Sequence, residues 1–457
     1  MKAGPRRTAL LGRRAAAAVA SRRPRRRPVR PRRLAGLWRY LAIVGPGLIV
    51  ANAGNDAGGV FTYTNTGAKY GLTLLWAFIP ILVALIVTQE MVGRLGCVTG
   101  KGLMDLIRER FGVRWTLFAS LVVIIANGGT VLAEFAGVAA GLSLLGVPQT
   151  ISVIAAALLI AVLVLRANRR LVERVFLALG LAFFSYIITA FTVHPDWVNI
   201  GTRLVVPSFA HPGTTSGAFV VDLIALIGTS ITPYMQLYLQ SAIVDKGTPE
   251  RELRYVRADI VSGSIFAVAV AVFIVITTGQ TIFAGAVPHH PHGLAGIGVS
   301  TAQEAAQALA PLAGTYAKDL FAVGLLGASL LAAAVLPLST AFVVCEAFGA
   351  ERSVQRRFAE APLFFILFIG LIVIAAGVVL FIPGTLLAGV AIGTQTLDGI
   401  LLPVLLVFII ILANDRRLLG DRRNGLVYNV IAVLLAGVLS LLTLTLVVTT
   451  LFGGLTG

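Results

Sequence analysis

Charged residues are scarce in this chain, and their scarcity excludes the soluble classes of protein. Only 12% of the 457 residues are Asp, Glu, Lys or Arg, whereas 57% are hydrophobic. Soluble domains carry about 25% charged residues. A water-soluble core of this size cannot hide so much apolar surface, so the composition indicates an all-α multi-pass membrane protein.

Two further absences narrow the possible functions. Cysteine is almost lacking, and Cys97 and Cys345 lie in or beside apolar stretches, so we expect inert thiols and no disulfide framework. A phosphate-binding loop of the Gly-x4-Gly-Lys-Ser/Thr type is also missing from the sequence. ATP hydrolysis and other enzyme activities are therefore not expected, and neither is a resident cofactor.

Acidic residues are missing from the first 38 residues, which contain "RRPRRRPVRPRR". Arg and Pro interrupt any apolar run there, so the segment does not resemble a secretory signal peptide. We expect residues 1–38 to form a disordered cytoplasmic arm that contacts anionic lipid headgroups. A transit peptide is a weaker alternative, and nucleic-acid binding is not expected.

Residues 39–457 read as one transmembrane transporter domain. A search for apolar stretches of ~20 residues predicts about eleven membrane helices. They centre near 41–66, 71–93, 115–145, 148–166, 171–193, 217–244, 256–284, 319–348, 361–381, 385–413 and 425–452. Between the second and third, "KGLMDLIRERFG" predicts a short amphipathic surface helix.

Basic residues gather in every second loop between the predicted helices. The first such loop contains Arg94 and Lys101, and the last contains Arg422 and Arg423. Cytoplasmic loops are the ones rich in Lys and Arg. This pattern predicts a cytoplasmic N-terminus and, for eleven helices, a C-terminus outside.

Two of the predicted helices are interrupted, the first by "NDAGG" and the sixth by "GTSITPYMQ". Broken backbone at membrane depth is tolerated only where protein buries it or where it lines a wet cavity. Two breaks five helices apart predict 5+5 inverted repeats, about 41–193 and about 217–413, with an extra helix at about 425–452 and a binding site between the repeats. Asp56 costs at least ~2.5 kcal/mol in the hydrocarbon region, so we expect it to hold a cation. The alternative is a glycine-packed helix crossing.

Three stretches resemble the Nramp divalent-metal transporters: "GPGLIVANAGNDAGGVFTYTNTGAKYGLTLLW" their first helix, "QEMVGRLGCVTGKGL" their second helix and its loop, and "LAEFAG" their third. The resemblance runs from about Gly45 to Pro403. It implies a leucine-transporter-like fold and import of divalent metal by alternating access.

The metal-site motifs of that family are altered here. Its Asp-Pro-Gly-Asn in helix one becomes Asp56, Ala57, Gly58, Gly59. Its Met-Pro-His-Asn in helix six becomes Thr232, Pro233, Tyr234, Met235, followed by an apparent one-residue insertion. If the downstream side is aligned instead, Met235 and Gln236 lie opposite His and Asn. In helix ten, Gln395 keeps the family's distance from a proline.

The altered site resembles that of the Nramp-related magnesium transporters. The resemblance implies a metal site drawn from Asp56, Gly59, Thr232, Met235, Gln236 and Gln395. A thioether favours softer metals, whereas Thr, Gln, Asp and backbone carbonyls offer hard oxygen. Mg2+ takes octahedral oxygen and keeps several waters on one or two carboxylates, while Ca2+ takes more protein oxygens. We therefore expect Mg2+, and also Mn2+, as substrate.

A second group of polar or adjoining residues is expected along the pathway or behind the ligands. It comprises Asn55, Ala57, Glu134, Tyr234, Gln240 and Asp398. Glu134 is either a proton relay or a packing carboxyl, and Asp398 either stands behind the ligands or caps a broken helix ten. In helix three the family's first acid is Val131 here, which leaves an incomplete proton route and predicts transport without proton coupling. "PHHPHG" at His289, His290 and His292 is expected to be a solvated loop.

Three rival functions remain open at this point. A proton-coupled Mn2+/Fe2+ symporter of the main Nramp type is the first. A sodium-coupled symporter of organic solutes is less favoured, because Asp56 would repel an anionic substrate. An intramembrane aspartyl protease is remote, because it needs two carboxylates that share a proton. A monomer is the favoured oligomeric state.

Overall fold

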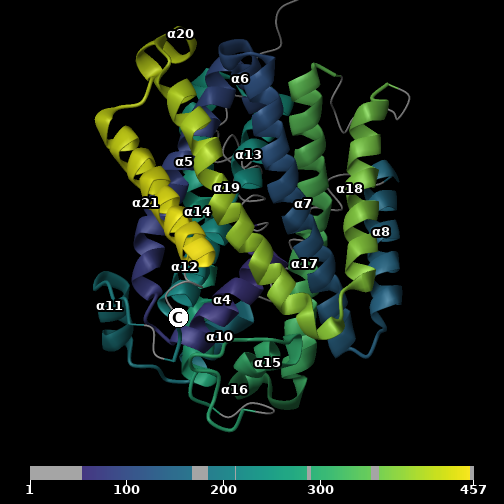
Figure 1. Ribbon diagram of the computed structural model, residues 1–457, viewed down its shortest axis with the longest axis vertical. Coiled ribbons are helices and arrows are strands. Elements are labelled where there is room, and N and C mark those ends of the chain that lie inside the picture. The colour runs from purple at the N-terminus through teal and green to yellow at the C-terminus, as the bar shows by residue number, and fades with distance from the viewer. Residues whose placement is uncertain (1–53, 167–183, 211–212, 286–289, 351–359, 453–457) are drawn as a thin grey trace, which may run out of the picture. The chain divides into compact units, whose positions relative to one another are not determined.

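The structure, a computed structural model, describes residues 54–166, 184–210, 213–285, 290–350 and 360–452. The N-terminal arm lies outside these residues, as does the first part of the first predicted helix. The α-helices are α4 (Ala57–Tyr70), α5 (Phe78–Thr99), α6 (Leu103–Phe111), α7 (Val113–Leu144), α8 (Gln149–Arg166), α10 (Phe184–Thr192), α11 (Trp197–Val205), α12 (Ser216–Ser230), α13 (Pro233–Asp245), α14 (Leu253–Thr281), α15 (Ala302–Ala306), α16 (Ala310–Ala313), α17 (Ala317–Phe348), α18 (Pro362–Phe381), α19 (Leu387–Asn414), α20 (Arg416–Leu419) and α21 (Leu426–Phe452) (Figure 1).

Among the described residues, eight helical segments are long and apolar enough to cross a membrane. They contain α5, α7, the pair α12 and α13, α14, α17, α18, α19 and α21. The shorter helices α4, α8 and α10 occupy the places of the first, fourth and fifth predicted spans. The helical character of the chain and the short helix α6 are therefore as the sequence predicts.

The interruption predicted in the sixth span is present, and the described part of the first span begins with non-helical backbone. Residues 54–56 are not helical, and α4 begins only at Ala57. The sixth span is divided into α12, which ends at Ser230, and α13, which begins at Pro233. The two breaks place irregular backbone inside the helical bundle.

Small residues allow the central helices to approach closely. A Cβ on Gly228 of α12 would lie 2.2 Å from the carbonyl oxygen of Gln395 and 2.5 Å from the amide nitrogen of Gly399 in α19. On α7, a Cβ on Gly137 would lie 2.3 Å from the Cβ of Ala57 in α4. Close backbone approach of this kind is how membrane helices associate without a hydrophobic driving force.

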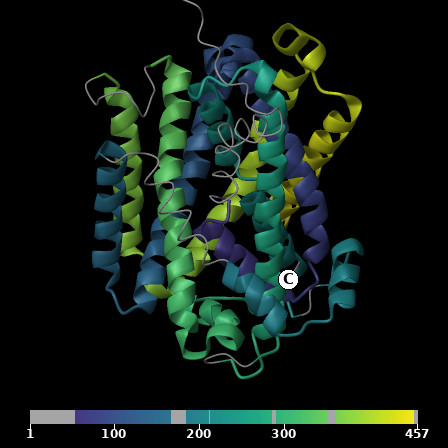
Figure 2. The ribbon, with the colours of Figure 1, turned by 180° about the vertical axis from the view of Figure 1, so that it is seen from behind.

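The helices around this centre are arranged unevenly. In both ribbon views α21 lies at one edge and α8 at the opposite edge, with α7 and α17 between them (Figures 1 and 2). Within the most apolar stretch of 18 residues, only 11% of α21 is buried, compared with 83% of the span formed by α12 and α13. The broken helix is thus inside the bundle and α21 is peripheral.

Three charged residues outside the candidate site, Glu90, Arg94 and Glu346, are buried among the helices. Glu90 and Arg94 on α5 are 3.3 Å apart, and Arg257 on α14 pairs with Glu90 at 2.7 Å. Glu346 accepts hydrogen bonds from the Ser241 hydroxyl at 2.9 Å and the Met104 amide at 3.2 Å. Charges and polar groups on neighbouring helices offset the cost of this burial.

Asp222 connects two helices through its carboxylate. It lies in the second turn of α12, where its carboxylate accepts hydrogen bonds from Tyr70 Oη at 2.6 Å and Lys69 Nζ at 2.8 Å. These contacts join the C-terminal end of α4 to α12.

Candidate metal centre

The first half of the candidate site is the start of α4. Asp56 is fully buried and caps the helix, with Oδ1 accepting a hydrogen bond from the Gly59 amide at 2.7 Å. Its second oxygen, Oδ2, has no hydrogen-bond partner. A buried carboxylate that uses only half of its acceptor capacity requires a further partner, either a proton or a cation.

The second half is the break between α12 and α13. Ile231 leaves the helix with φ −130° and ψ 56°, and Pro233 has no backbone N–H to donate to the carbonyl of Thr229. Thr232 occupies the N-cap position of α13, yet its hydroxyl makes no capping bond and has no partner. The break therefore leaves the Thr232 hydroxyl unused by either helix, and Pro233 supplies no amide proton to the Thr229 carbonyl.

Gly59 is where the two halves meet. A Cβ placed on Gly59 would lie 3.2 Å from Asp56 Oδ1, 3.2 Å from Thr229 Oγ1 and 3.1 Å from the carbonyl oxygen of Gly54. Thr229 is completely buried and its hydroxyl has no hydrogen-bond partner. Sequence reasoning did not single out Thr229, although its position within the break was a signal that could have found it.

Two longer helices close the site from other sides. Gln395 of α19 lies against the first turn of α4, because a Cβ on Gly58 would be 2.0 Å from its Nε2. Glu134 of α7 accepts a hydrogen bond from the Ala57 amide at 3.2 Å. Gln395 Oε1 and Glu134 Oε1 have no partners. The structure thus brings Gln395 and Glu134 to the first turn of α4, which Asp56 caps.

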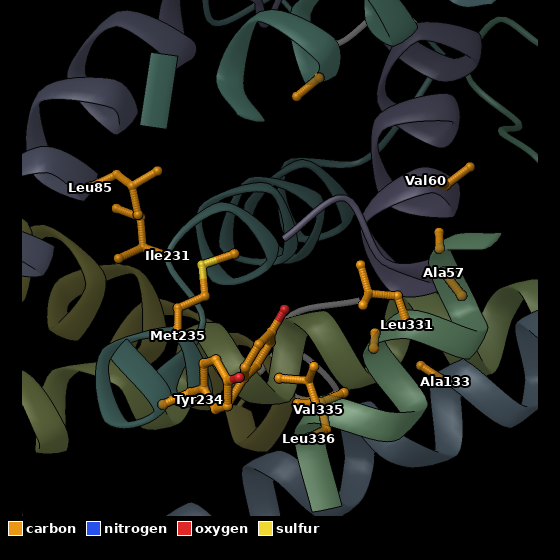
Figure 3. Close-up of a cluster of buried hydrophobic side chains, with 14 of the residues drawn as sticks. Ala57, Val60, Leu85, Ala133, Ile231, Tyr234, Met235, Leu331, Val335 and Leu336 are labelled. Carbon is orange, nitrogen blue, oxygen red and sulfur yellow. The ribbon is translucent and has the colours of Figure 1, made fainter. Parts of the chain in front are cut away.

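The first turn of α13 carries the residues on which the alternative alignment depends. Gln236 is fully buried, and neither its oxygen nor its nitrogen has a hydrogen-bond partner. Met235 belongs to a buried hydrophobic cluster and lies on the side of Ile231 and Leu85, whereas Tyr234 lies towards Val335 (Figure 3). Of these three residues, Gln236 is therefore the one whose side-chain amide is free to contact an ion or its waters.

The unpartnered buried atoms around the breaks are mostly oxygens. They are Asn55 Oδ1, Asp56 Oδ2, Glu134 Oε1, Thr229 Oγ1, Thr232 Oγ1, Gln236 Oε1 and Gln395 Oε1. Buried polar groups in native proteins are nearly always paired. Within the described part of the chain, no three His, Cys, Asp or Glu side chains form a metal-binding group. The donor set therefore suits a hard cation that keeps part of its water shell.

Other predicted residues lie elsewhere or act differently. Gln240 donates a hydrogen bond to the carbonyl oxygen of Lys101 at 2.9 Å, and so joins α13 to the segment before α6. Asp398 does not cap a broken helix, because α19 is continuous from Leu387 to Asn414. His290 lies 3.9 Å from Glu304, His292 is exposed, and residue 289 lies outside the described residues.

Comparison with known proteins decides the family. The family model described as natural resistance-associated macrophage protein-like (Nramp) matches residues 47–449. The chain belongs to the Nramp family. The divalent metal cation transporter MntH of Verminephrobacter eiseniae is 28% identical over 410 residues, covering 88% of each chain. MntH of Bacillus subtilis is 31% identical over 322 residues, covering 67% of this chain and 71% of its own.

A solved structure shows the fold of this Nramp protein. The crystal structure of the Eremococcus coleocola manganese transporter, in complex with an aromatic bis-isothiourea compound, matches with a TM-score of 0.73. The match covers 92% of this chain and 89% of that one at 22% identity. The all-α, leucine-transporter-like membrane fold that the sequence predicts is confirmed.

Proposed function

We propose that this Nramp protein is a secondary transporter that imports divalent metal ions by alternating access, with Mg2+ as the main substrate and Mn2+ also accepted. The observation that carries the proposal is the set of unpartnered oxygens at the two helix breaks, with Asp56 as the one carboxylate on α4 and Thr229 facing it across Gly59. The printed names of the relatives, divalent metal cation and manganese transporters, support the substrate class.

The preference for Mg2+ is proposed from the ligand chemistry. Thr232 offers a hydroxyl where the family has a thioether, and Gly59 leaves space where the family has an amide side chain. Hard oxygen ligands suit Mg2+ and Mn2+ alike, and a site without the larger side chains suits an ion that releases its waters reluctantly. Transport is proposed to run down the electrochemical gradient of the metal, without a coupled proton.

The second candidate function is a proton-coupled Mn2+/Fe2+ symporter. One observation favours it, because Glu134 is a buried carboxyl that contacts the start of α4 and could carry a proton there.

The N-terminus is proposed to be cytoplasmic, with the basic arm against anionic lipid, since loops rich in Lys and Arg are the cytoplasmic ones.

The test is metal uptake into proteoliposomes that contain the purified protein, with Mg2+, Mn2+ and Ca2+ measured side by side. Protein-free liposomes of the same lipid are the control. We expect uptake of Mg2+ and Mn2+ above the control and little uptake of Ca2+. Equal rates with and without protein for all three ions would contradict the proposal, and uptake of Mn2+ alone would refute the Mg2+ preference.

A further inference from the structure

A second buried carboxyl lies next to the candidate metal centre but is not part of it. Asp398 of α19 is 1% exposed, and its Oδ2 accepts a hydrogen bond from Thr130 Oγ1 at 2.8 Å. Its Oδ1 has no hydrogen-bond partner, and no Lys, Arg or His in the described ranges forms an ion pair with it. A carboxylate buried in this way requires compensation.

The position of Asp398 is fixed by two helices that run in opposite directions. α6 precedes α7 and α20 follows α19, and α6 and α20 lie at the same end of the bundle (Figure 1). Moving towards that end leads from Glu134 to Thr130 on α7, and from Gln395 to Asp398 on α19. Both steps are three or four residues, which corresponds to about 5 Å along a helix. Asp398 and Thr130 therefore lie one turn from the metal centre, towards the end that carries the basic loops.

Further unpartnered oxygens lie on α7 and α17, beside a contact between these two helices. Asn127, one turn beyond Thr130, donates from Nδ2 to Thr340 Oγ1 of α17 at 2.9 Å, while its Oδ1 has no partner. Ser339, next to Thr340, is 1% exposed and its hydroxyl also lacks a partner. Serine in a helix commonly bonds to the carbonyl four residues earlier, as Thr340 does here. The unpaired hydroxyl of Ser339 is therefore not explained by its own helix.

We propose that Asp398, Asn127, Thr130 and Ser339 form a second cation station, which a hydrated divalent ion occupies after it leaves the site at Asp56. This inference rests on the proposed transport function. The station offers one carboxylate, one amide oxygen and two hydroxyls, all hard oxygen donors. Such a set suits Mg2+ or Mn2+ that retains several waters. It would divide the passage through the protein into two shorter steps.

The test counts Mn2+ ions bound to the purified full-length protein, with free Mn2+ measured by electron paramagnetic resonance during a titration. The variants are Asp56→Ala, Asp398→Asn and both together. Asp398→Asn keeps an oxygen that can accept from Thr130 and removes only the charge. We expect Asp56→Ala to retain one weaker Mn2+ site, and the double variant to lose it. Asp398→Asn alone should weaken that site about tenfold or more, which corresponds to about 1.4 kcal/mol.

Controls distinguish a failure of the second cation station from a failure of the proposed transport function. Asp319→Asn changes an exposed carboxylate at the start of α17 and should bind Mn2+ like the wild type. If Asp398→Asn does not fold, Asn127→Ala in the Asp56→Ala background should weaken the residual site instead. The station is refuted if Asp56→Ala abolishes all Mn2+ binding, or if the residual site survives both Asp398→Asn and Asn127→Ala. A wild-type protein that binds two Mn2+ ions without transporting any would refute the transport function and not the station.

Discussion

Asp56 Oδ1 and Thr229 Oγ1 lie at equal distances, 3.2 Å each, from the point where a Cβ on Gly59 would stand. The two residues belong to the two interrupted helices, one in each predicted repeat. The missing side chain of Gly59 is therefore the reason that the start of α4 and the end of α12 share one polar space.

Replacing Asp56 tests the proposed ligand directly. We expect Asp56→Ala to reduce uptake of Mg2+ and Mn2+ to the level of protein-free liposomes, because no other carboxylate lies on the first turn of α4. The variant should still fold, since Ala removes one capping bond worth about 1 kcal/mol. Uptake is measured with radioactive or fluorescent reporters, and Asp319→Ala serves as the exposed control. Near wild-type uptake by Asp56→Ala would show that the ion binds elsewhere.

Filling the space at Gly59 should block transport without removing a ligand. A leucine there meets Thr229, Asp56 and the Gly54 carbonyl at 3.1–3.2 Å from its Cβ alone, so Gly59→Leu is expected to abolish uptake. The matched control is Gly389→Leu in α19, where an added Cβ meets no atom within 4 Å. Gly389→Leu should transport at the wild-type rate. Equal rates for the two leucine variants would contradict a site at Gly59.

Metal entry is expected to occur without proton import. The phenol of tyrosine normally titrates at pH ~10, so we expect Tyr234 not to exchange protons at neutral pH as the histidine that the Nramp resemblance implies at this position would. Val131 replaces an acid, which leaves Glu134 without a second acid on its helix face. Internal pH is recorded with a trapped dye during Mn2+ uptake, and a protonophore provides the positive signal. Acidification that follows metal uptake in a fixed ratio would instead support the proton-coupled symporter.

Restoring sulfur at the helix-six break should shift the metal preference. We expect Thr232→Met to increase the inhibition of Mg2+ uptake by Cd2+ and to slow Mg2+ uptake, because a thioether favours soft ions and takes volume from the waters of Mg2+. The comparison variants are Met235→Ala and Gln236→Ala. If Thr232→Met changes nothing while Gln236→Ala alters the preference, the downstream alignment of helix six is the correct one.

The contact between α12 and α19 should be sensitive to a single methyl group. Gly228→Ala places a Cβ 2.2 Å from the Gln395 carbonyl oxygen, so the two helices must separate. Overpacking of this kind costs about 1–3 kcal/mol, and we expect a lower midpoint of thermal unfolding in detergent. Gly389→Ala, which meets open space in α19, should leave the midpoint unchanged. A drop of equal size in both variants would show that the effect does not come from the contact between α12 and α19.

The sequence alone determined the class of protein and the break in the sixth span, and it singled out Asp56 as a candidate ligand. These features follow from local rules. A long apolar run must span the bilayer, Gly and Pro interrupt the helix, and an isolated carboxylate at that depth requires a compensating partner. The family resemblance added the fold, which depends on the same pattern of spans.

Only the tertiary structure decided which distant residues share the site. Thr229 lies within the predicted break, but its relation to Asp56 arises only because two helix ends meet at a glycine. The pairing of Thr130 with Asp398, and of Glu90 with Arg94 and Arg257, likewise depends on how far each helix is shifted along its neighbours. That shift is set by close packing over many small residues at once, and no single stretch of sequence contains it.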